Sequence, residues 1–581
     1  MPRPLRSALV LGLVAATSLA ASAQEIRVLA DAPQHRFDGA GVSFGLFLGH
    51  HYSMPAAGQD EAVRLIAEDL DLAFLQDYPD GEIEPADDPG YYDRRADYVR
   101  AARAYRPGLE FSLVTNKYPS RLRTEITVNG RQYLVLDVDR EGIYDEVAEW
   151  YFSLFQAFAE RGVSVEVLNV VNEPDLDVCG NDPLQCRPYH YGYGDDTRRG
   201  VAEVFAQAVP AFLALFDDPD VNTLGMAKPR IMGPSTIAPN GALDFIRYMK
   251  AERPEAWDQI DIVATHQYIN GVRGDLFQAL RVEAEGKPIW QSETHASKTF
   301  GPDALRPGHR TSLSLAQLFG AAVNFGTSMW AYFETNYPNP ADPDDPGQFN
   351  PGGLLSVPFN TTAPEPYKHY YAFRQLTSTQ PDSSDVLDYT ASAGRRADVV
   401  AFRKAGQDTV YVTVTNTGGE TKSITLEVEE GGGLRTVASV ATRITDADRS
   451  DEPAGTVTPP AGTATLALDL GPYSIHTYVI ALGAPVAADD GPDALAATLA
   501  APAPNPAASS TTLGYALAAP GDVALTVHDA LGREVARLAE GARSAGPHRV
   551  AFDTHTLASG VYVVRLRAGG AVTTQRMTVI R

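Results

Sequence analysis

Between about residue 36 and residue 372, short apolar runs alternate with longer stretches in which apolar residues recur every three or four positions. The short runs predict buried strands, and the longer spacing predicts amphipathic helices, as in YDEVAEWYFSLFQAFAERG at 144–162. The expected strands are RFDGAGVSF, LAFLQ, LEFSLVT, VSVEVLNVV, RIMGPS, IDIVATH, PIWQS and TSMWAYF. Eight strands that alternate with helices predict a parallel (β/α)8 barrel.

Two insertions follow expected strands, on the face where barrels of this type hold their functional loops. The first, RTEITVNGRQYLVLD at 123–137, predicts a β-hairpin with a turn at Asn129-Gly130. The second, from Asn336 to Pro366, is rich in Pro and Gly and lacks periodicity, as functional rim loops often do. Both insertions are expected to shape the mouth of the barrel.

The pattern changes after residue 372. From 373 to 484, apolar and polar residues alternate without helical spacing, in segments such as DVVAFRK and TVYVTVTN, which predicts an antiparallel β-sandwich. Residues 485–504 have the Ala, Pro and Asp content of a linker, and 505–581 predict a small all-β module. The expected fold class is therefore α/β: a barrel over 24–372, a β-sandwich, and a small C-terminal all-β, immunoglobulin-like domain.

The first 23 residues have the composition of a secretory signal peptide. Arg3 and Arg6 supply the charged start, residues 7–20 are apolar, and residues 21–23 (ASA) offer a cleavage site. No later apolar run is long enough to span a bilayer. The net charge of −25 argues against nucleic acid or an anionic membrane as partner, since both are bound through basic patches. We expect an exported, soluble monomer.

The chain has two cysteines, Cys179 and Cys186, with six residues between them. In the oxidising compartment that a signal peptide implies, we expect a disulfide that staples this loop. A metal-binding pair is the alternative, but no His stands at ligand spacing. No metal and no cofactor are therefore expected.

Two expected strands end in a carboxylate after a dense apolar run. Glu173 follows VLNVV in VLNVVNEPDLD, and Glu293 ends PIWQSE. In a (β/α)8 barrel, residues just past the C-terminal strand ends converge on one pocket, so these carboxylates are expected to meet. Such a pair suits glycoside hydrolysis, because one carboxyl protonates the leaving oxygen and the other attacks the anomeric carbon. The alternative is that each Glu is a solvated loop residue.

Other side chains at strand ends suit a sugar-binding pocket. His266 and Tyr268 lie two residues apart, and therefore on one face, at the end of the sixth strand. Trp330 in the eighth strand offers a flat face for a sugar ring, and Asn172 could bind a sugar hydroxyl. Each signal is weak alone, since His266 could equally be a core histidine and Trp330 simple barrel packing.

Together, these strand ends resemble the clan of retaining glycoside hydrolases with (β/α)8 barrels. Within the clan, the chain resembles glycoside hydrolase family 30. IRVLADAPQHRFDGAGVSFG is similar to that family's opening, YKHYYAFRQLTSTQPDS to its exit from strand 8, and LDLGPYSIHTYVI to its closing sandwich strand. These pieces bracket residues 24–484, and the resemblance implies that residues 24–35 form a strand of the side sandwich.

The resemblance also implies residue roles. Glu173 would be the general acid/base and Glu293 the nucleophile of a double displacement, with carboxyl groups about 5–5.5 Å apart. Asn172 would contact the 2-hydroxyl, Tyr268 would hold Glu293, and Trp330 would floor the subsite where cleavage occurs. An acid/base must be protonated when substrate binds, so burial and the second carboxylate are expected to raise its pKa.

Some positions depart from the clan or compete with this assignment. Many clan members place an Arg at the end of the second strand, where this chain has Gln76 and Asp77. The substrate therefore stays open among xylan, β-1,6-glucan, β-1,6-galactan and related glycosides. Glu334 is a second candidate nucleophile, and the acidic run at 342–345 is interpreted as a solvated loop rather than a Ca²⁺ site.

The C-terminal module contains PNP, DALGREV and SGVYVVRL, which resemble the C-terminal sorting domains of type IX secretion substrates in Bacteroidetes-like bacteria. The residues alone predict a small β-sandwich with turns at Leu531-Gly532 and Ser559-Gly560. A carbohydrate-binding module is the alternative, but its aromatic residues besides His are only Tyr515, Phe552 and Tyr562. The resemblance implies that the type IX secretion machinery is a partner and that the protein is secreted or held at the cell surface.

These observations predict an exported retaining glycoside hydrolase that acts on a β-linked polysaccharide or oligosaccharide. A non-catalytic carbohydrate-binding surface protein on the same fold is the alternative. A surface adhesion protein is a third interpretation, but the repeated stalk modules that it predicts are absent from the sequence.

Overall fold

The computed structural model describes residues 24–45, 48–128, 131–175, 196–268, 272–295, 307–337, 353–378, 383–392, 398–486, 497–529, 534–568 and 571–580. Several sequence predictions lie outside these residues: the signal peptide at 1–23, the Cys179–Cys186 disulfide, and the turns at Asn129-Gly130 and Leu531-Gly532. The acidic run at 342–345 lies outside them too.

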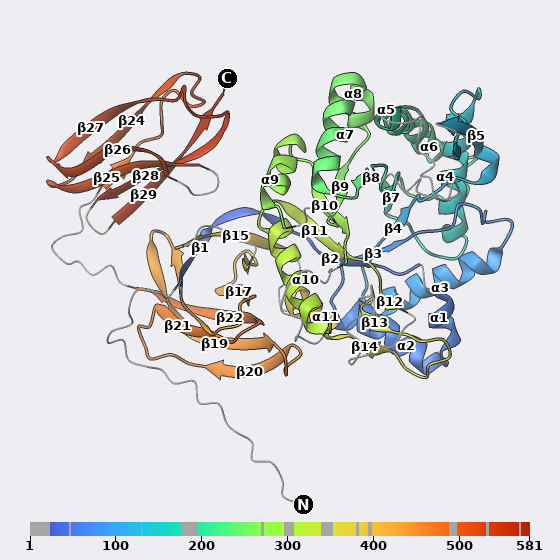
Figure 1. The fold of residues 1–581 in the computed structure, drawn as a ribbon, viewed down its shortest axis with the longest axis horizontal. Coiled ribbons are helices and arrows are strands. Elements are labelled where there is room, and N and C mark those ends of the chain that lie inside the picture. Colours follow the sequence, from blue (N-terminus) through green and yellow to red (C-terminus); the bar gives the residue numbers. More distant parts are fainter. Residues whose placement is uncertain are drawn as a thin grey trace, which may run out of the picture.

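A closed barrel of eight parallel strands forms the first and largest domain (Figure 1). Its strands follow the order β10-β11-β2-β3-β4-β7-β8-β9. All eight strands expected from the apolar runs are present, so the predicted barrel fold is confirmed. The strands are β2 (Gly39–Ser43), β3 (Phe74–Asp77), β4 (Glu110–Val114), β7 (Val167–Asn169), β8 (Arg230–Thr236), β9 (Ile262–His266), β10 (Ile289–Glu293) and β11 (Thr327–Tyr332).

Helices cover the outside of the barrel, and α4 (Ile143–Ala159) shows why. Its apolar residues recur every three or four positions, and Trp150, Tyr151 and Phe158 are buried. The other described helices are α1 (Leu48–Ser53), α2 (Ala56–Arg64), η1 (Leu65–Asp69), α3 (Pro89–Tyr105), η2 (Ser120–Leu122), α5 (Asp196–Glu203), η4 (Val204–Ala208), α6 (Val209–Leu215), α7 (Pro239–Glu252), α8 (Pro254–Asp258), α9 (Gly274–Glu283), α10 (Pro307–Val323) and α11 (Lys368–Thr377).

Apolar side chains fill both the barrel interior and the layer between strands and helices. The interior cluster includes Phe74, Met232, Trp290 and Met329. A larger cluster joins the strands to the surrounding helices. Because the interior is packed, a pocket for chemistry can form only at an end of the barrel.

Two small sheets stand after barrel strands. β5 (Arg123–Val128) and β6 (Arg131–Leu136) pair antiparallel, which confirms the predicted hairpin. β12 (Asn336–Tyr337), β13 (Leu355–Ser356) and β14 (Glu365–Pro366) form a three-stranded sheet after β11. The backbone N–H of Leu355 donates to Thr335 O at 2.8 Å, and that of Thr335 donates to Ser43 O at 2.8 Å. This sheet is therefore fastened to the C-terminal end of β2.

The second domain is a nine-stranded sheet in the order β20-β19-β22-β17-β16-β15-β1-β18-β21. β1 (Gln24–Phe37) pairs antiparallel with β15 and parallel with β18, so the start of the described chain lies among the orange strands of Figure 1. An added β18–β19 pairing curls the sheet around its own apolar core. Its other strands are β15 (Ser384–Ala391), β16 (Val399–Arg403), β17 (Thr409–Asn416), β18 (Lys422–Glu430), β19 (Gly433–Thr445), β20 (Glu452–Val457), β21 (Thr465–Leu470) and β22 (Ser474–Pro485).

The C-terminal domain packs two small antiparallel sheets face to face around one apolar core. Alternation decides which side chains enter it: on β28, Tyr562, Val564 and Leu566 are buried and the residues between them are exposed. The sheets are β23 (Ala497–Leu499), β24 (Ser510–Leu517) and β27 (Gly546–Asp553), and β26 (Glu534–Arg543), β25 (Gly521–His528), β28 (Gly560–Ala568) and β29 (Ala571–Val579). The predicted fold class is confirmed for all three domains.

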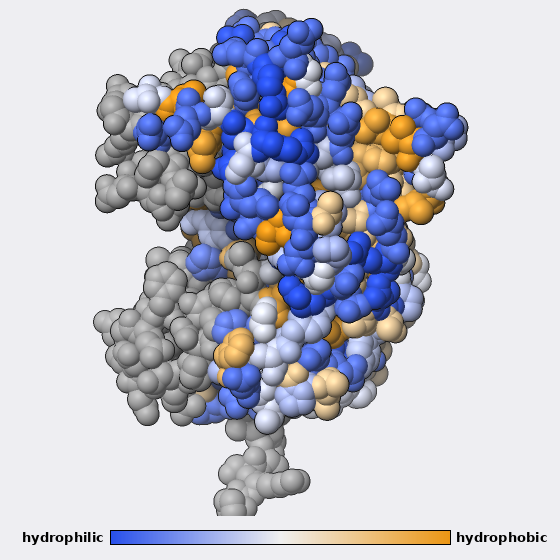
Figure 2. Space-filling view, turned by 90° about the vertical axis from the view of Figure 1, so that its right-hand side faces the viewer, coloured by the Kyte–Doolittle hydropathy of each residue, from blue (hydrophilic) through white to orange (hydrophobic). Residues whose placement is uncertain are grey.

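The surface agrees with the acidic composition. Figure 2 shows one face covered mainly by hydrophilic side chains, with apolar residues in small separate groups. Within the described part of the chain, no helix combines the length and the apolar character needed to cross a bilayer.

Candidate active site at the barrel mouth

Both predicted carboxylates lie at the C-terminal end of the barrel strands. Glu293 is the last residue of β10, and Glu173 stands four residues beyond the end of β7. They are only 5% and 6% exposed, which excludes the alternative that they are solvated loop residues. Glu173 has a left-handed backbone (φ 45°), which costs energy for a non-glycine residue. Its N–H donates to Ser235 O at 2.8 Å, and this bond ties the loop to β8.

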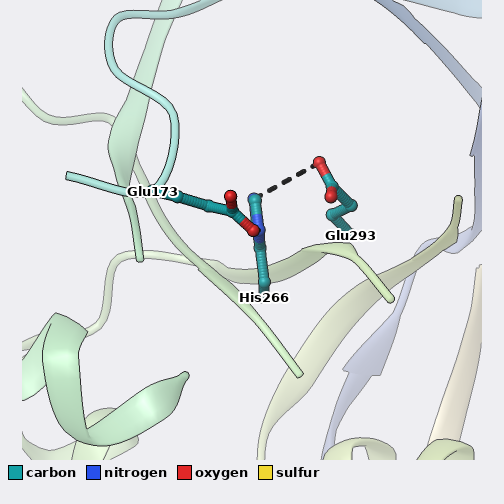
Figure 3. A group of neighbouring side chains, drawn as sticks. All are labelled: Glu173, His266 and Glu293. Atoms are coloured by element: carbon teal, nitrogen blue, oxygen red, sulfur yellow. Dashed lines mark hydrogen bonds and ion pairs between the residues drawn. The ribbon is translucent and has the colours of Figure 1, made fainter. Parts of the chain in front are cut away.

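His266, the last residue of β9, lies between the two carboxylates (Figure 3). Its Nδ1 is 3.0 Å from Glu173 Oε1, and its Nε2 is 3.7 Å from Glu293 Oε2. The imidazole is fully buried. One ring therefore connects the two carboxylates that sequence analysis placed on separate strands.

Two phenols hold Glu293, one at each carboxylate oxygen. Tyr268 donates to Oε1 at 2.6 Å, and Tyr78, which directly follows β3, donates to Oε2. Gln76 Nε2 donates to the Tyr78 hydroxyl at 2.7 Å and to Ser292 O at 2.6 Å. Tyr268 was expected from the sequence but Tyr78 was not, although the phenol stands one residue beyond Gln76 and Asp77 at the end of the second strand.

Burial and mutual charge set the protonation of these groups. Burial raises the pKa of Glu293, the His266 cation works against that rise, and Glu173 adds to it. Burial lowers the pKa of His266, but Glu293 and Glu173 outweigh burial, so its pKa is raised overall. Burial and the charge of Glu293 keep the pKa of Tyr78 and of Tyr268 well above the usual range, so both phenols remain donors.

Asp175 is a further carboxylate behind this cluster, and its side chain is half-buried. Its Oδ1 accepts the backbone N–H of Ile237 at 2.9 Å, and its Oδ2 lies where a Cβ on Gly241 of α7 would stand. Burial raises the pKa of Asp175 to about 6. This contact fastens the loop that carries Glu173 to the start of α7.

Asn172 and Trp330, the two other residues predicted to contact the sugar, occupy different surroundings. Asn172 is buried and its Nδ2 donates to Asn116 Oδ1 at 3.4 Å, so the loop that carries Glu173 contacts the segment after β4. The prediction that Trp330 floors the cleavage subsite is wrong, because Trp330 is fully buried between rings of Phe319 and Phe373 on the helical side of β11. Strand alternation turns Trp330 outward, which is the barrel-packing alternative.

Phe333, which follows β11, contacts the site through Tyr78. It meets the Tyr78 ring edge-to-face with 5.8 Å between centroids, and it is partly exposed. Glu334, the other candidate nucleophile, is buried beside it and contributes negative charge at Tyr78.

Among the described residues, Glu173, His266 and Glu293 are the group that could hold a metal ion, since one ligand atom from each lies within 4.8 Å of the others. The imidazole, however, turns a different nitrogen toward each carboxylate. One ion can bind only one nitrogen of a ring, so the set fits an imidazole paired with two carboxylates better than a metal centre. Such an arrangement can hold one carboxyl protonated beside an ionised one.

Different comparisons with known proteins match different parts of the chain. Residues 503–580 match the family model described as the secretion system C-terminal sorting domain. A search of curated proteins by sequence finds no match. Solved structures, in contrast, match most of the chain.

A GH30 endoxylanase from Clostridium papyrosolvens has 16% identity and a TM-score of 0.57, over 79% of this chain and 100% of that one. A conserved exported protein from Bacteroides fragilis has 11% identity and a TM-score of 0.59, over 78% and 100%. An endo-β1,6-glucanase has 13% identity and a TM-score of 0.54, over 80% and 96%.

At these identities the likeness shows the fold: the barrel and side sandwich have the architecture of GH30 glycosidase structures. The C-terminal match marks a protein that the type IX system delivers to the cell surface or beyond.

Proposed function

We propose that this protein is a retaining glycoside hydrolase that cleaves β-glycosidic bonds of an extracellular polysaccharide. The observation that carries this proposal is that Glu173 and Glu293 are both buried at the same end of the barrel. One carboxylate oxygen of each lies within 4.8 Å of the other and of a ring nitrogen of His266. Retaining enzymes place their carboxyl groups about 5–5.5 Å apart, whereas inverting ones need about 6.5–9.5 Å to admit a water. The short separation supports double displacement.

In the first step, Glu293 attacks the anomeric carbon while Glu173 gives its proton to the departing glycosidic oxygen. The bond from the anomeric carbon to that oxygen breaks as a bond to Glu293 forms. Tyr78 and Tyr268 orient the attacking carboxylate and favour its ionised form. His266 fixes the carboxyl of Glu173 through Nδ1.

In the second step, Glu173 removes a proton from water, and the water oxygen attacks the anomeric carbon. The bond to Glu293 breaks, and the sugar leaves with its original anomeric configuration. Glu293 returns as a carboxylate and Glu173 as an acid, so the cycle closes with one water consumed. No step requires a cofactor.

The substrate class follows from two observations. The chain carries a sorting domain for export, so its substrate lies outside the cell. Solved structures with this fold include proteins named as xylanases and as an endo-β1,6-glucanase. We therefore propose a β-linked polysaccharide, with xylan, β-1,6-glucan and β-1,6-galactan as the first candidates.

The test is a panel of β-glycans incubated with the exported chain and with three variants: Glu173→Gln, Glu293→Gln and Glu334→Gln. We expect new reducing ends from one glycan, and a loss of about 10²–10⁴-fold for Glu173→Gln, the range for removal of a general acid. Glu293→Gln should lose at least as much. Glu334→Gln is the matched control, and if it alone abolished cleavage, Glu334 would be the nucleophile.

Product stereochemistry tests the mechanism separately. Proton NMR early in the reaction should show the β-anomer first, followed by mutarotation. An initial α-anomer would overturn the retaining proposal while leaving hydrolysis intact. A glycan that binds without cleavage would instead support the non-catalytic alternative.

A further inference from the structure

We propose that Tyr78 is a positioning residue that orients the nucleophile and favours its ionised form, so that two neutral phenols, rather than a Lys or Arg, bind the two oxygens of Glu293. The inference rests on the proposed function. It concerns a residue that strand-end motifs do not reveal and that reaches the site from the far side of the barrel.

Each oxygen of the Glu293 carboxylate has its own phenol donor. Tyr268 belongs to the end of β9, which is next to β10, and binds Glu293 Oε1. Tyr78 follows β3, which lies three strands away on the other side, and binds Oε2. A single donor would leave the carboxylate free to turn about its last bond. Donors on both oxygens fix its plane, which in-line attack requires.

The hydrogen bonds around Tyr78 have a fixed direction. The Gln76 side chain faces Ser292 O, and a carbonyl oxygen can only accept, so the amide turns its NH₂ group to this side. The same NH₂ donates to the Tyr78 hydroxyl. The phenol oxygen thereby accepts from Gln76, and its own proton points to Glu293. Both hydrogen bonds are therefore donated in the same direction, from Gln76 to Tyr78 and from Tyr78 to Glu293.

Buried neighbours support Tyr78 from behind. The preceding residue, Asp77, is fully buried and forms an ion pair with Arg95 at 2.9 Å. A Cβ on Gly45 would stand 1.9 Å from Asp77 Oδ1, so the backbone approaches closely here. The Phe333 ring packs against the phenol from the other side. Tyr78 is thus held by packing rather than placed by the carboxylate it binds.

Apart from His266, no cation among the described residues pairs with Glu293. Among the described residues, Glu293 forms no ion pair with Lys or Arg, and Arg95 is engaged by Asp77. Neutral donors favour the ionised carboxylate less strongly than a guanidinium would, and so leave the nucleophile more basic. The titratable groups that face Glu293 or its phenol are His266, Tyr268, Tyr78, Glu173 and Glu334.

The test is Tyr78→Phe in the full chain, which removes one hydroxyl and keeps the ring. We expect kcat to fall about 100-fold, the scale for one lost donor at a reacting centre. KM should change little. The acid limb of the kcat/KM profile should move to higher pH, because Glu293 loses a donor that favours its ionised form. Gln76→Leu removes the donor that directs the Tyr78 proton toward Glu293. It should therefore also move the acid limb to higher pH, by a smaller amount.

Tyr52→Phe is the matched control, because that hydroxyl donates to Arg94 O on the exposed side of the barrel. It should leave both kcat and the pH profile unchanged. Circular dichroism should show Tyr78→Phe folded. Unchanged kcat and an unmoved acid limb in folded Tyr78→Phe would overturn the inference while wild-type turnover still supported the proposed function.

A substrate-free measurement separates the two proposals. Infrared spectra of protein with ¹³C-labelled glutamate, minus those of Glu293→Gln, report the ionisation of Glu293 directly. The midpoint should rise in Tyr78→Phe whether or not a cleaved glycan has been found. A midpoint equal to that of the wild type would refute the role of Tyr78, and wild-type inactivity on every glycan would refute only the reaction.

Discussion

Arginine is used differently in the barrel and in the C-terminal domain. Arg95 is 6% exposed, pairs with the fully buried Asp77, and lies 3.6 Å from the centre of the Tyr91 ring. Arg537 of β26 is exposed and pairs with Glu534 and Glu540 on its own strand. The first pair supports the loop that carries Tyr78, and the second lies on a solvated sheet face.

The two regions also differ in net charge and in what they bury. Residues 503–580 contain seven Arg against five Asp and Glu, so the rest of the chain carries a charge of −27. The buried polar residues described in the C-terminal domain are threonines, whereas the barrel mouth buries Glu173, Glu293, His266 and Asp77. Buried charge costs free energy unless it is paired. The buried ionisable groups at the barrel mouth therefore cost folding free energy, whereas the polar residues buried in the described part of the C-terminal domain carry no charge.

Arg95→Met is expected to have the largest effect on stability, and it tests whether the buried Arg95 pair differs from the exposed Arg537 pairs. Removing one partner leaves the Asp77 carboxylate buried without its cation, which typically costs about 3–5 kcal/mol of unfolding free energy. Urea unfolding followed by tryptophan fluorescence measures it, because Trp150, Trp257, Trp290 and Trp330, the four of the chain, all lie in the barrel. A loss below about 1 kcal/mol would mean that the pair behaves like a surface pair.

The next effect is expected from Asp175→Asn. Burial raises the pKa of this acid from 3.8 to about 6, so between these values the folded chain holds a proton that the unfolded chain has released. Stability therefore falls as pH rises through this window. Asn cannot titrate and can still accept from Ile237, so the variant should lack this slope. It should also be more stable at pH 7, by about 3 kcal/mol at most.

Asp244→Asn is the control for that experiment, since Asp244 is exposed on the same α7 against which Asp175 packs. Urea midpoints at pH 4 and pH 7 should change in parallel for the wild type and this control. If Asp175→Asn showed the wild-type slope, the Asp175 carboxyl would not be protonated in the folded protein.

A smaller effect is expected on the pKa of His266 when Glu293 is replaced in the variant Glu293→Gln. Burial lowers the pKa of His266, whereas the charge of Glu293, together with Glu173 and Asp175, raises it. Removing that charge should lower the pKa of the imidazole. A raised imidazole pKa contributes stability at low pH that is lost as pH rises through the folded value, so this window should shrink. Histidine NMR titration of the two proteins measures the change.

The smallest effect is expected from Arg537→Met in the C-terminal domain. Exposed pairs contribute about 0–1 kcal/mol, so thermal unfolding of this domain followed by circular dichroism should hardly change. A destabilisation comparable to that of Arg95→Met would break the comparison, because it would show that the β26 pairs are structural.

Sequence patterns predicted the barrel well because its signals are local. Each strand is a short apolar run, and each carboxylate follows such a run directly, as Glu293 does in PIWQSE. Tyr268 could be included because it stands two residues from His266 on the same strand end. Trp330 was misplaced because an apolar run buried on both faces gives no sign of which side each residue faces.

Tyr78 was missed for a different reason. It lies 215 positions from Glu293, and its hydroxyl reaches the carboxylate only because the barrel closes. Nothing in FLQDYPDGE distinguishes a phenol that points into the mouth from one that packs on a helix. The direction of the hydrogen bond from Gln76 is likewise visible only beside Ser292.

The sequence by itself determined the periodicities, and with them the eight strands, their helices, the two β-domains and the strand ends that carry Glu173 and Glu293. Periodicity is a property of neighbouring residues, so it can be read along the chain. Only the tertiary structure decided that His266 connects the carboxylates, that Tyr78 completes the hold on Glu293, and that Trp330 faces outward. These are relations between strands, which exist only once ring closure brings distant segments to one mouth.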